Sequence, residues 1–524
     1  MAQTQSTLPH EDEQAVARRR DRCAPERRKF VLIAAILASA LGFIDGTIVA
    51  IALPQMRASL GADFAGAQWI SNSYMLMLTA LVLLGGAMGD KLGLRRTFSF
   101  GIALFTVASI ACALATTTPM MIFFRAIQGM GAAIMVPGSM ALIAKHFPRE
   151  ERGKALGVWV AASSVTTAMG PLLGGLVLTY GGPETWRWLF GINLPVGLFI
   201  ILLLRAQVPD DRPAARDGLG GLDWAGAALA TCALGALALG LTWLGEGGGS
   251  VGLAAFAIIL GTGVLGFALW WEWRMKRVGG NPMVDLDLFQ LRPFWGANLF
   301  TLFVWASIGA VTFFLPMLVI VAWQLPESYA GTMFLAFSLT VSPASIVVGR
   351  LVGRMGSRFF MTLGAFTVVV AHLTIAWGVA VQSYFGFLVP GLALLGLGIG
   401  LSASPLSTAI VNAVDEDHQG EASGINNTVA RMGQLYAVAG LGALVAYVYQ
   451  LMIRGSSLPA DIQNAMIEEG YGERLTGGLY QVATVDLQAV AMTHATVVLF
   501  MALALLATLG MVTAFFTQEG RSVQ

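Results

Sequence analysis

The sequence of 524 residues has little charge: Asp, Glu, Lys and Arg make up 12% of it, against about 25% in an average soluble domain. The formal net charge is +1, so no basic excess points to a nucleic-acid partner. Hydrophobic residues account for 56% of the chain and the mean hydropathy is +0.71. This composition excludes an ordinary soluble domain and indicates a protein that lies mostly within a lipid bilayer.

Residues and motifs that carry chemistry are also scarce. The three cysteines, Cys23, Cys112 and Cys232, are too few and too scattered for a disulfide framework. The stretch RGKALG at 152–157 lacks the first Gly and the final Ser or Thr of a Walker A loop. No cluster of His, Cys and Asp has the spacing of a metal site, and no nucleophile elbow is present. We therefore expect neither an enzyme nor a cofactor, and we expect any energy to come from an ion gradient.

Long apolar runs recur from one end of the chain to the other. They predict an all-α integral membrane protein with fourteen transmembrane helices. The predicted spans are 30–53, 69–89, 97–117, 119–144, 154–180, 186–205, 222–245, 251–272, 294–321, 328–349, 358–380, 383–410, 421–449 and 492–517. The external loop 450–491 is polar and is expected to be irregular.

The positive charges are divided unequally between the two sides of the predicted membrane. Of the 31 Lys and Arg residues, 25 fall on the side of the N-terminus, four on the other side, and two inside spans. The positive-inside rule therefore places both termini in the cytoplasm of a multi-pass protein of the cell membrane, inner or plasma. The tail 1–29 is followed by no cleavage site, so we expect a cytoplasmic extension rather than a signal peptide. Residues 518–524 form the cytoplasmic C-terminus.

The two halves of the chain repeat each other. GGAMGDKLGLRR at 85–96 resembles VGRLVGRMGSRF at 348–359, and GMGAA at 129–133 resembles GLGIG at 396–400, with near-constant offsets. This repeat predicts two six-helix bundles, 30–205 and 294–517, around a central cavity. Residues 206–293 then form an inserted helix pair with its flanking loops. Parallel repeats with a site near the membrane midplane are a known plan for transporters.

Several motifs together resemble one family. They are DGTIVAIALP (45–54), GGAMGDKLGLRR (85–96), RAIQGMGAAIMVPG (125–138), AMGPLLGG (168–175) and WRWLFGINLPVG (186–197). The chain resembles the fourteen-helix drug:proton antiporters of the major facilitator superfamily, the multidrug resistance efflux type. The chain departs from that pattern at Leu94, where a basic residue is usual, and at LYAVAG (435–440), which replaces a Gly-rich run. The resemblance implies proton-driven efflux by alternating access and a protein that works as a monomer.

One carboxylate and one guanidinium fall deep inside predicted spans. At 1.5 Å per residue, Asp45 lies about 13 Å from the outer end of its helix and Arg125 about 9 Å from the outer end of its own. A charge at such depth is costly and marks a candidate functional site. The corresponding positions of the second half carry Ser307 and Leu392. We interpret Asp45 and Arg125 as the proton-coupling pair; the alternative is a structural ion pair.

The loop between the second and third spans carries a cluster of charges and glycines: Gly86, Asp90, Lys91, Gly93, Arg95 and Arg96. In the resembled family this loop latches the two bundles together on the cytoplasmic side. Positive-inside anchoring is the simpler alternative, and it explains Arg95 and Arg96 but not Asp90. We interpret the cluster as a cytoplasmic gate.

The fifth span contains GPLLGG, which the resembled family associates with antiport. Its residues Gly170, Pro171, Gly174 and Gly175 allow close helix approach and a bend. Tight packing alone is compatible with the same residues. The second half replaces Gly170 and Gly174 by Ala437 and Leu441, so the feature is confined to one half.

Further polar or aromatic residues of the spans are candidates for the lining of the cavity: Gln128, Asn298, Trp305, His372, Asn426, Asn427 and Arg431. For His372 in particular, packing inside an apolar helix is the simpler reading.

The sequence as a whole predicts a multi-pass exporter that exchanges protons for amphipathic, often cationic, small molecules. Its expected partners are that substrate, protons and the lipid bilayer, with no nucleic acid. Two alternatives stay open: an exporter of one endogenous lipid or biosynthetic metabolite, and a membrane sensor that does not transport.

Overall fold

The computed structural model describes residues 25–209, 222–246, 251–280, 282–415, 418–472 and 482–517, and every regular element within them is a helix. The first helices are α2 (Pro25–Leu60), α3 (Phe64–Leu92), α4 (Leu94–Ala113), α5 (Thr118–His146), α6 (Arg149–Tyr180), α7 (Trp186–Gly191) and α8 (Asn193–Gln207). They are followed by α9 (Trp224–Glu246), α10 (Val251–Arg277), the short η3 (Leu286–Gln290), and α11 (Arg292–Met317) with η4 (Leu318–Ala322). The remaining elements are α12 (Glu327–Met355), α13 (Ser357–Ala380), η5 (Tyr384–Leu388), α14 (Val389–Asn412), α15 (Gln419–Tyr436), η7 (Ala437–Leu441), α16 (Gly442–Arg454), α17 (Ala460–Glu469), α18 (Val482–Thr513) and η8 (Ala514–Phe516).

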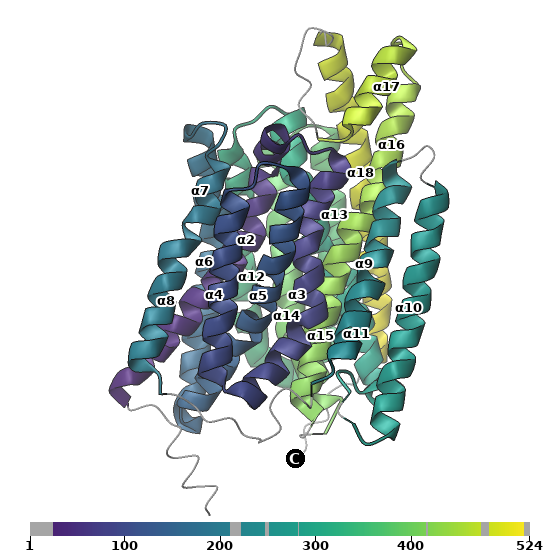
Figure 1. The fold of residues 1–524 in the computed structure, drawn as a ribbon. Helices are drawn as coiled ribbons and strands as arrows, with labels where there is room; N and C mark the ends of the chain where they lie inside the picture. The colour runs from purple at the N-terminus through teal and green to yellow at the C-terminus, as the bar shows by residue number, and fades with distance from the viewer. Residues whose placement is uncertain are drawn as a thin grey trace, which may run out of the picture.

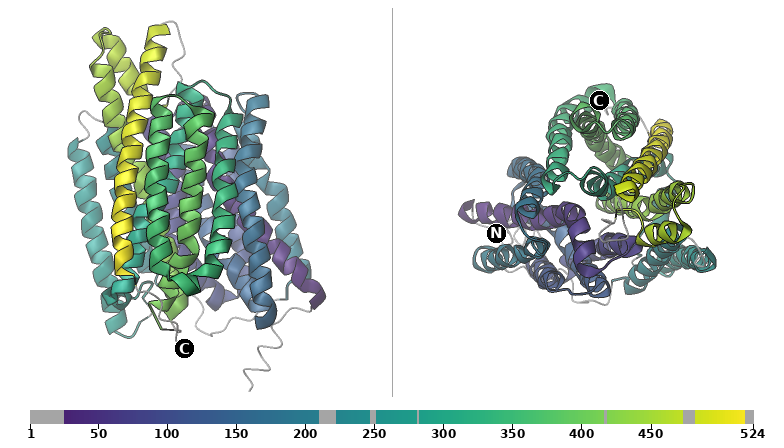
Figure 2. Two further views of the ribbon diagram at one scale, coloured as in Figure 1. Left: turned by 180° about the vertical axis from the view of Figure 1, so that it is seen from behind. Right: turned by 90° about the horizontal axis from the view of Figure 1, so that it is seen from above.

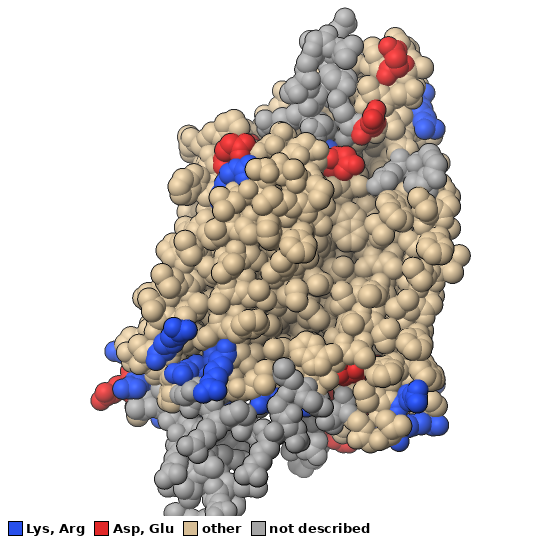
Figure 3. All heavy atoms as spheres, in the orientation of Figure 1, with Lys and Arg blue, Asp and Glu red and all other residues tan. Residues whose placement is uncertain are grey.

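The long helices run side by side through one bundle, and α2 begins at the same end of the molecule at which α18 ends (Figures 1 and 2). Lys and Arg side chains gather at that end on the face shown in Figure 3. The last turn of α8 carries Arg205, and the last turn of α10 carries Arg274, Lys276 and Arg277. The middle of the same face carries almost no charge. This distribution is the one expected of a helical membrane protein.

Thirteen helices of the described residues are long and apolar enough to cross a membrane, and they correspond to thirteen of the fourteen predicted spans. In the remaining predicted span, 154–180, the apolar helical segment is Met169–Tyr180, which is shorter than the other thirteen. The chain there forms the 32-residue helix α6. The multi-pass helical fold is therefore confirmed, and the count of fourteen stays a prediction.

The helices depart from two of the predicted loops. The helix of the first predicted span continues past Pro54 to Leu60, and Arg57, which lies between the predicted spans 30–53 and 69–89, is buried in its last turn. The segment 450–491 is also not simply irregular: α16 extends to Arg454, α17 occupies Ala460–Glu469, and α18 begins at Val482. The side chain of Met466, in the middle of α17, is fully buried, so packing against the bundle stabilises a helix whose polar composition hid it. Residues 473–481 lie outside the described part.

The internal repeat appears in the geometry of the helices. α3 and α12 have the same length of 29 residues, and each is followed by a glycine with positive φ, Gly93 at 96° and Gly356 at 82°. Such backbone angles favour glycine. α4 and α5 also approach closely at Gly101 and Gly131, as α13 and α14 do at the corresponding Gly364 and Gly398. The two halves therefore share turn geometry and helix contacts as well as sequence.

Candidate functional site

The two deeply placed charges of the first half form a direct ion pair. Nη1 of Arg125, on α5, donates to Oδ2 of Asp45, on α2, at 2.6 Å. Both residues are 2% exposed. The depth argument from the sequence therefore placed the two residues correctly relative to each other.

Gln128 closes this pair into a ring. Its Nε2 donates to Oδ1 of Asp45 at 2.8 Å, and its Oε1 accepts from Nη1 of Arg125 at 2.6 Å. Gln128 is fully buried and lies one helical turn from Arg125 on α5. Each oxygen of Asp45 thus has its own donor, which stabilises the charged carboxylate inside the protein.

α3 holds the guanidinium from the other side. Arg125 Nε donates to the carbonyl oxygen of Ile70 at 3.2 Å, and its Cζ lies 4.3 Å from the ring centroid of Tyr74. Sequence reasoning missed Tyr74, because a tyrosine in an apolar span gives no signal of what it stacks on. The ring and its supports connect three helices of the first half, α2, α3 and α5.

The second half lacks such a pair at the corresponding positions. Ser307 of α11 is fully buried, and its hydroxyl has no hydrogen-bond partner among the described residues. Leu392 of α14 is fully buried as well. Since the halves share their helix contacts, a charge pair is not required to hold six such helices together. This asymmetry sets Asp45 and Arg125 apart from the common scaffold.

The glycines of GPLLGG lie directly against the helix that carries Asp45. A Cβ added at Gly170 would be 3.3 Å from Cα of Ile44, and one added at Gly174 would overlap the side chain of Ile48. Ile44 and Ile48 flank Asp45 on α2. These two glycines therefore allow α6 to approach α2 at the level of the Asp45 ring.

Gly175 faces the other half of the molecule. A Cβ there would be 2.6 Å from the carbonyl oxygen of Glu327 at the start of α12, and one at Gly331 would overlap the carbonyl oxygen of Pro171. The Ser328 amide also donates to Oγ1 of Thr179 at 2.9 Å. The C-terminal end of α6 and the N-terminal end of α12 are thus closely packed. Gly331 and Ser328 were not singled out from the sequence, because no motif marks them.

Gln55 adds a further contact between the halves at this end. Its Nε2 donates to Oε1 of Glu327 at 3.2 Å. Together with the α6–α12 packing, this contact joins the two halves near the end of α2.

The predicted gate residues lie around the turn between α3 and α4. Gly93 adopts its positive φ there, and Nη1 of Arg95 donates to the carbonyl oxygen of Val208 at 2.9 Å. Lys91 is half-buried and Arg96 is exposed, while Gly86 packs loosely on Pro137 of α5. Asp90 belongs to α3, and its side chain lies outside the described part. These positions are compatible with a latch and with simple anchoring alike.

The structure divides the cavity candidates into separate groups. Asn426 of α15 donates to Oδ1 of Asn298 at 3.2 Å and to Oγ1 of Thr301 at 2.7 Å, both on α11. These hydrogen bonds join two helices of the second half. Trp305 is half-buried on α11, and Asn427 is exposed on the neighbouring face of α15.

Arg431 is distinct because it is a cation in the interior of the apolar stretch Glu421–Arg454, which α15, η7 and α16 form together. Its Nε is buried and has no hydrogen-bond partner among the described residues.

His372 belongs to neither group. It is fully buried on α13, and neither ring nitrogen has a hydrogen-bond partner in the part of the chain that the structure describes. Its ring lies 5.9 Å from that of Phe500 on α18. This environment favours the simpler reading, a packing residue between two helices.

Three features are typical of membrane transport proteins: a bundle of apolar helices, two halves that repeat each other, and charged residues buried inside the bundle. This chain has all three. The model of the Major Facilitator Superfamily matches residues 35–438, and the chain belongs to this family. The resemblance first seen in the motifs is thereby confirmed.

Relatives of the chain carry names that refer to multidrug resistance, drug efflux or transport. It is 32% identical over 420 residues to the multidrug resistance protein Stp of Mycobacterium tuberculosis, covering 78% of this chain and 75% of Stp. It is 31% identical over 436 residues to the drug efflux pump JefA of the same organism, covering 80% and 81%. A probable actinorhodin transporter of Streptomyces coelicolor is 29% identical over 432 residues, covering 80% and 73%.

Solved structures agree on the fold. A bacterial homologue of the human lysosomal transporter Spinster, inward-facing and occupied, superimposes with a TM-score of 0.64 at 14% identity, covering 95% of this chain and all of that one. An auto-inhibited POT family peptide transporter gives 0.61 at 16% identity, covering 95% and 99%.

Proposed function

We propose that the protein exports amphipathic, often cationic, small molecules from the cytoplasm in exchange for protons, by alternating access. The observation that carries this proposal is the buried ring of Asp45, Arg125 and Gln128, which is present in one half only. The names of two relatives, the drug efflux pump JefA and the multidrug resistance protein Stp, support the direction of transport.

Asp45 is the proton-binding group in this scheme. As a carboxylate it accepts from Arg125 and Gln128. When it takes up a proton from outside, it loses its charge and its attraction to the Arg125 guanidinium weakens. Release of the proton to the cytoplasm restores the pair. The energy available from a membrane potential is about 2.3 kcal/mol per charge per 100 mV.

The helices next to Asp45 provide a route from protonation to movement. Gly170 and Gly174 hold α6 against α2, and Gly175 holds α6 against α12 of the other half. A change in the ring can therefore reach the interface between halves through a single helix. At the cytoplasmic end of the molecule, we assign the gate to Gly86, Asp90, Lys91, Gly93, Arg95 and Arg96. The contacts of these residues with the other half change when the halves rotate.

The proposed organisation follows the repeat. Residues 30–205 and 294–517 form the two six-helix halves, 206–293 supply the inserted pair α9 and α10, and α6 counts as the fourteenth span. Both termini face the cytoplasm, the protein acts as a monomer, and no cofactor takes part. Asn427, Trp305 and Arg431 contribute to the substrate cavity, whereas Asn298 and Asn426 mainly fix one of its walls.

One substrate panel tests the proposal. Accumulation of lipophilic cations, neutral drugs and acidic aromatic metabolites is measured in a host that lacks its own pumps, with and without a protonophore. The proposal requires efflux of several unrelated compounds that stops when the proton gradient is collapsed. Efflux of one endogenous metabolite or lipid alone would favour the alternative exporter. The absence of efflux for every compound, with correctly inserted protein, would contradict transport and favour a sensor.

A further inference from the structure

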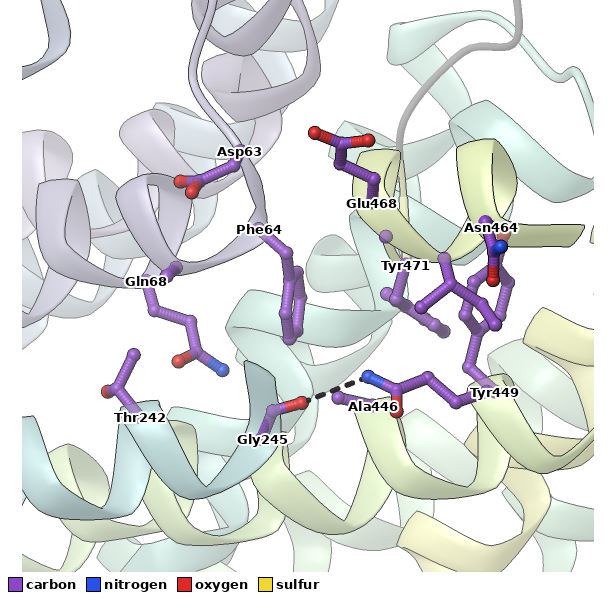
Figure 4. A pocket seen from close by; sticks show the side chains of 14 residues that line it. Asp63, Phe64, Gln68, Thr242, Gly245, Ala446, Tyr449, Asn464, Glu468 and Tyr471 are labelled. Carbon is purple, nitrogen blue, oxygen red and sulfur yellow. Dashed lines mark hydrogen bonds between the residues drawn. The ribbon is translucent and has the colours of Figure 1, made fainter. Parts of the chain in front are cut away.

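A cavity of about 320 Å³ lies at the outer end of the molecule, where α3, α9, α16 and α17 meet (Figure 4). This volume is at the lower end of the range for small-molecule sites. None of its lining residues belongs to the ring of Asp45, Arg125 and Gln128. It includes residues of the two segments that the proposed transport cycle leaves without a role, the pair α9–α10 and the external helix α17.

Aromatic rings form one wall of the cavity. The rings of Phe64 and Tyr471 lie 5.8 Å apart, and those of Tyr449 and Tyr471 lie 6.2 Å apart, both with edge-to-face geometry. The Tyr471 hydroxyl is 2.8 Å from Oγ1 of Thr496. Burial raises the pKa of this phenol above its usual value, so the ring is uncharged. Because the rings are held by one another, little order has to be gained when a ligand binds.

A buried arginine fixes the chain on both sides of this wall. Arg57 donates through Nη1 to the carbonyl oxygen of Tyr471 at 2.8 Å and through Nε to that of Ala62 at 3.2 Å. The whole residue Arg57 is 1% exposed. Its guanidinium donates to these two backbone oxygens. The loop before α3 and the segment after α17 are thus tied together from distant parts of the sequence.

The charge of the cavity lining has one sign. Asp63 and Glu468 line it and are both exposed, and none of the described lining residues is Lys, Arg or His. The side chain of Thr242, on α9, lines the same cavity. This residue is 3% exposed, and its hydroxyl has no hydrogen-bond partner among the described residues. The cavity therefore combines two carboxylates, an aromatic ring and an unsatisfied hydroxyl. The accessible ring is that of Phe64, because Tyr449 and Tyr471 are each 1% exposed.

We propose that this cavity binds, from outside the cell, an organic monocation that carries an aromatic ring. Carboxylates attract the cation, and the Phe64 ring stabilises both its charge and its apolar part. An anion would meet two negative charges in the same space, and a purely apolar molecule would leave the carboxylates and Thr242 without partners.

The cavity joins parts of the protein that belong to different halves. Gln68 of α3 donates to the carbonyl oxygen of Val438 of η7 at 3.3 Å, and Gln450 of α16 donates to that of Gly245 of α9 at 3.3 Å. If the proposed transport cycle holds, opening of the outer side separates α3 from α16 and divides the cavity. A ligand that contacts both walls binds the closed state better and shifts the population toward it. An external cation then inhibits export without competing for the substrate.

Binding is tested on the purified full-length protein in lipid nanodiscs, by calorimetric titration with benzyltrimethylammonium. The variants are Glu468→Gln and Asp63→Asn, because Asn keeps the oxygen that Asp63 uses to cap the Gly66 amide at 2.6 Å. Asp461→Asn is the matched control, since Asp461 is an exposed acid of the same helix α17 and does not line the cavity. Each cavity variant should raise Kd about three- to fivefold and the double variant about tenfold or more, with Asp461→Asn unchanged.

An unchanged Kd in the double variant would overturn the proposal. So would an equal loss of affinity in Asp461→Asn, because that result would assign binding to the general surface charge. Phe64→Leu removes a π-face without a charge change and should also weaken binding; an unchanged Kd would exclude the aromatic wall.

Export is measured separately in intact cells with the probe added outside. The proposal predicts inhibition that the double variant relieves, and inhibition equal in both proteins would overturn it. If the cells show no export at all, the transport proposal fails, and the calorimetric result still decides whether the site exists.

Discussion

Replacement of Gly175 by Ala should shift the protein toward the state that is open to the outside. In the structure a Cβ at this position would be 2.6 Å from the carbonyl oxygen of Glu327 and 3.1 Å from Cα of Ser328. Side-chain carbons essentially never approach backbone closer than 3.0 Å. The obstacle is backbone, so no rotamer change can relieve it, and α6 and α12 must move apart by several tenths of an ångström.

The cost falls on one conformation. Overpacking by a methyl group typically destabilises a closely packed contact by about 1–3 kcal/mol. In the proposed transport cycle α6 and α12 separate at this end when the outer side opens, so the methyl group would have no equivalent obstacle in the open state. The ratio of open to closed protein should therefore rise by about 5- to 150-fold.

The assay is pulsed electron–electron distance measurement between spin labels at the outer ends of α6 and α12, on an otherwise cysteine-free protein in nanodiscs. Gly157→Ala is the control, since it makes the same change on the same helix, where a Cβ would meet nothing within 4 Å. The long-distance population should grow in Gly175→Ala and stay at the wild-type level in Gly157→Ala. Identical distributions in all three proteins would refute the close contact as a determinant of closure.

Three further predictions follow from the charges and the turns. Asp90→Asn should reduce efflux while the protein still reaches the membrane, as measured by efflux and surface quantification; unchanged efflux would count against a gate at this loop. In a cysteine-free background, a single cysteine at position 457 should react with an impermeant thiol reagent in intact cells and one at 212 should not, and the reverse pattern would contradict cytoplasmic termini. Gly93→Ala forces a Cβ into a backbone with φ of 96° and should lower the free energy of unfolding by about 1–2 kcal/mol, measured as a lower midpoint of thermal unfolding. The corresponding Gly356→Ala should behave alike, and no loss of stability in either variant would refute strain at these turns.

The sequence predicted the features that depend on membrane depth and on repetition. Hydrophobic length identifies spans without knowledge of the partners of each helix, and distance along a helix placed Asp45 and Arg125 at one level before any contact was known. The repeat likewise aligned Gly93 with Gly356, and both adopt a positive φ directly after a helix of 29 residues.

Features that depend on the partner of a side chain were not predictable. Gln128 was proposed as a cavity residue, yet it completes the ion-pair ring, and Tyr74 stacks on Arg125 from another helix. The glycines of one motif turned out to face two different helices, α2 and α12, which a linear spacing cannot reveal. α17 was missed because its helix depends on burial of residues such as Met466 against the rest of the fold.

The central claim is that protonation of Asp45 couples substrate export to proton uptake. It is tested most directly by substrate-induced proton release from everted membrane vesicles with an imposed pH gradient, in which wild-type protein is compared with Asp45→Asn and Asp45→Glu. The account predicts that Asp45→Asn still binds substrate and releases no protons, because the amide cannot exchange a proton. Asp45→Glu should recover part of the release, with a changed pH dependence, since the carboxylate moves by one methylene. Full substrate-induced proton release by a correctly folded Asp45→Asn protein would contradict the account and leave the Asp45 ring a structural ion pair.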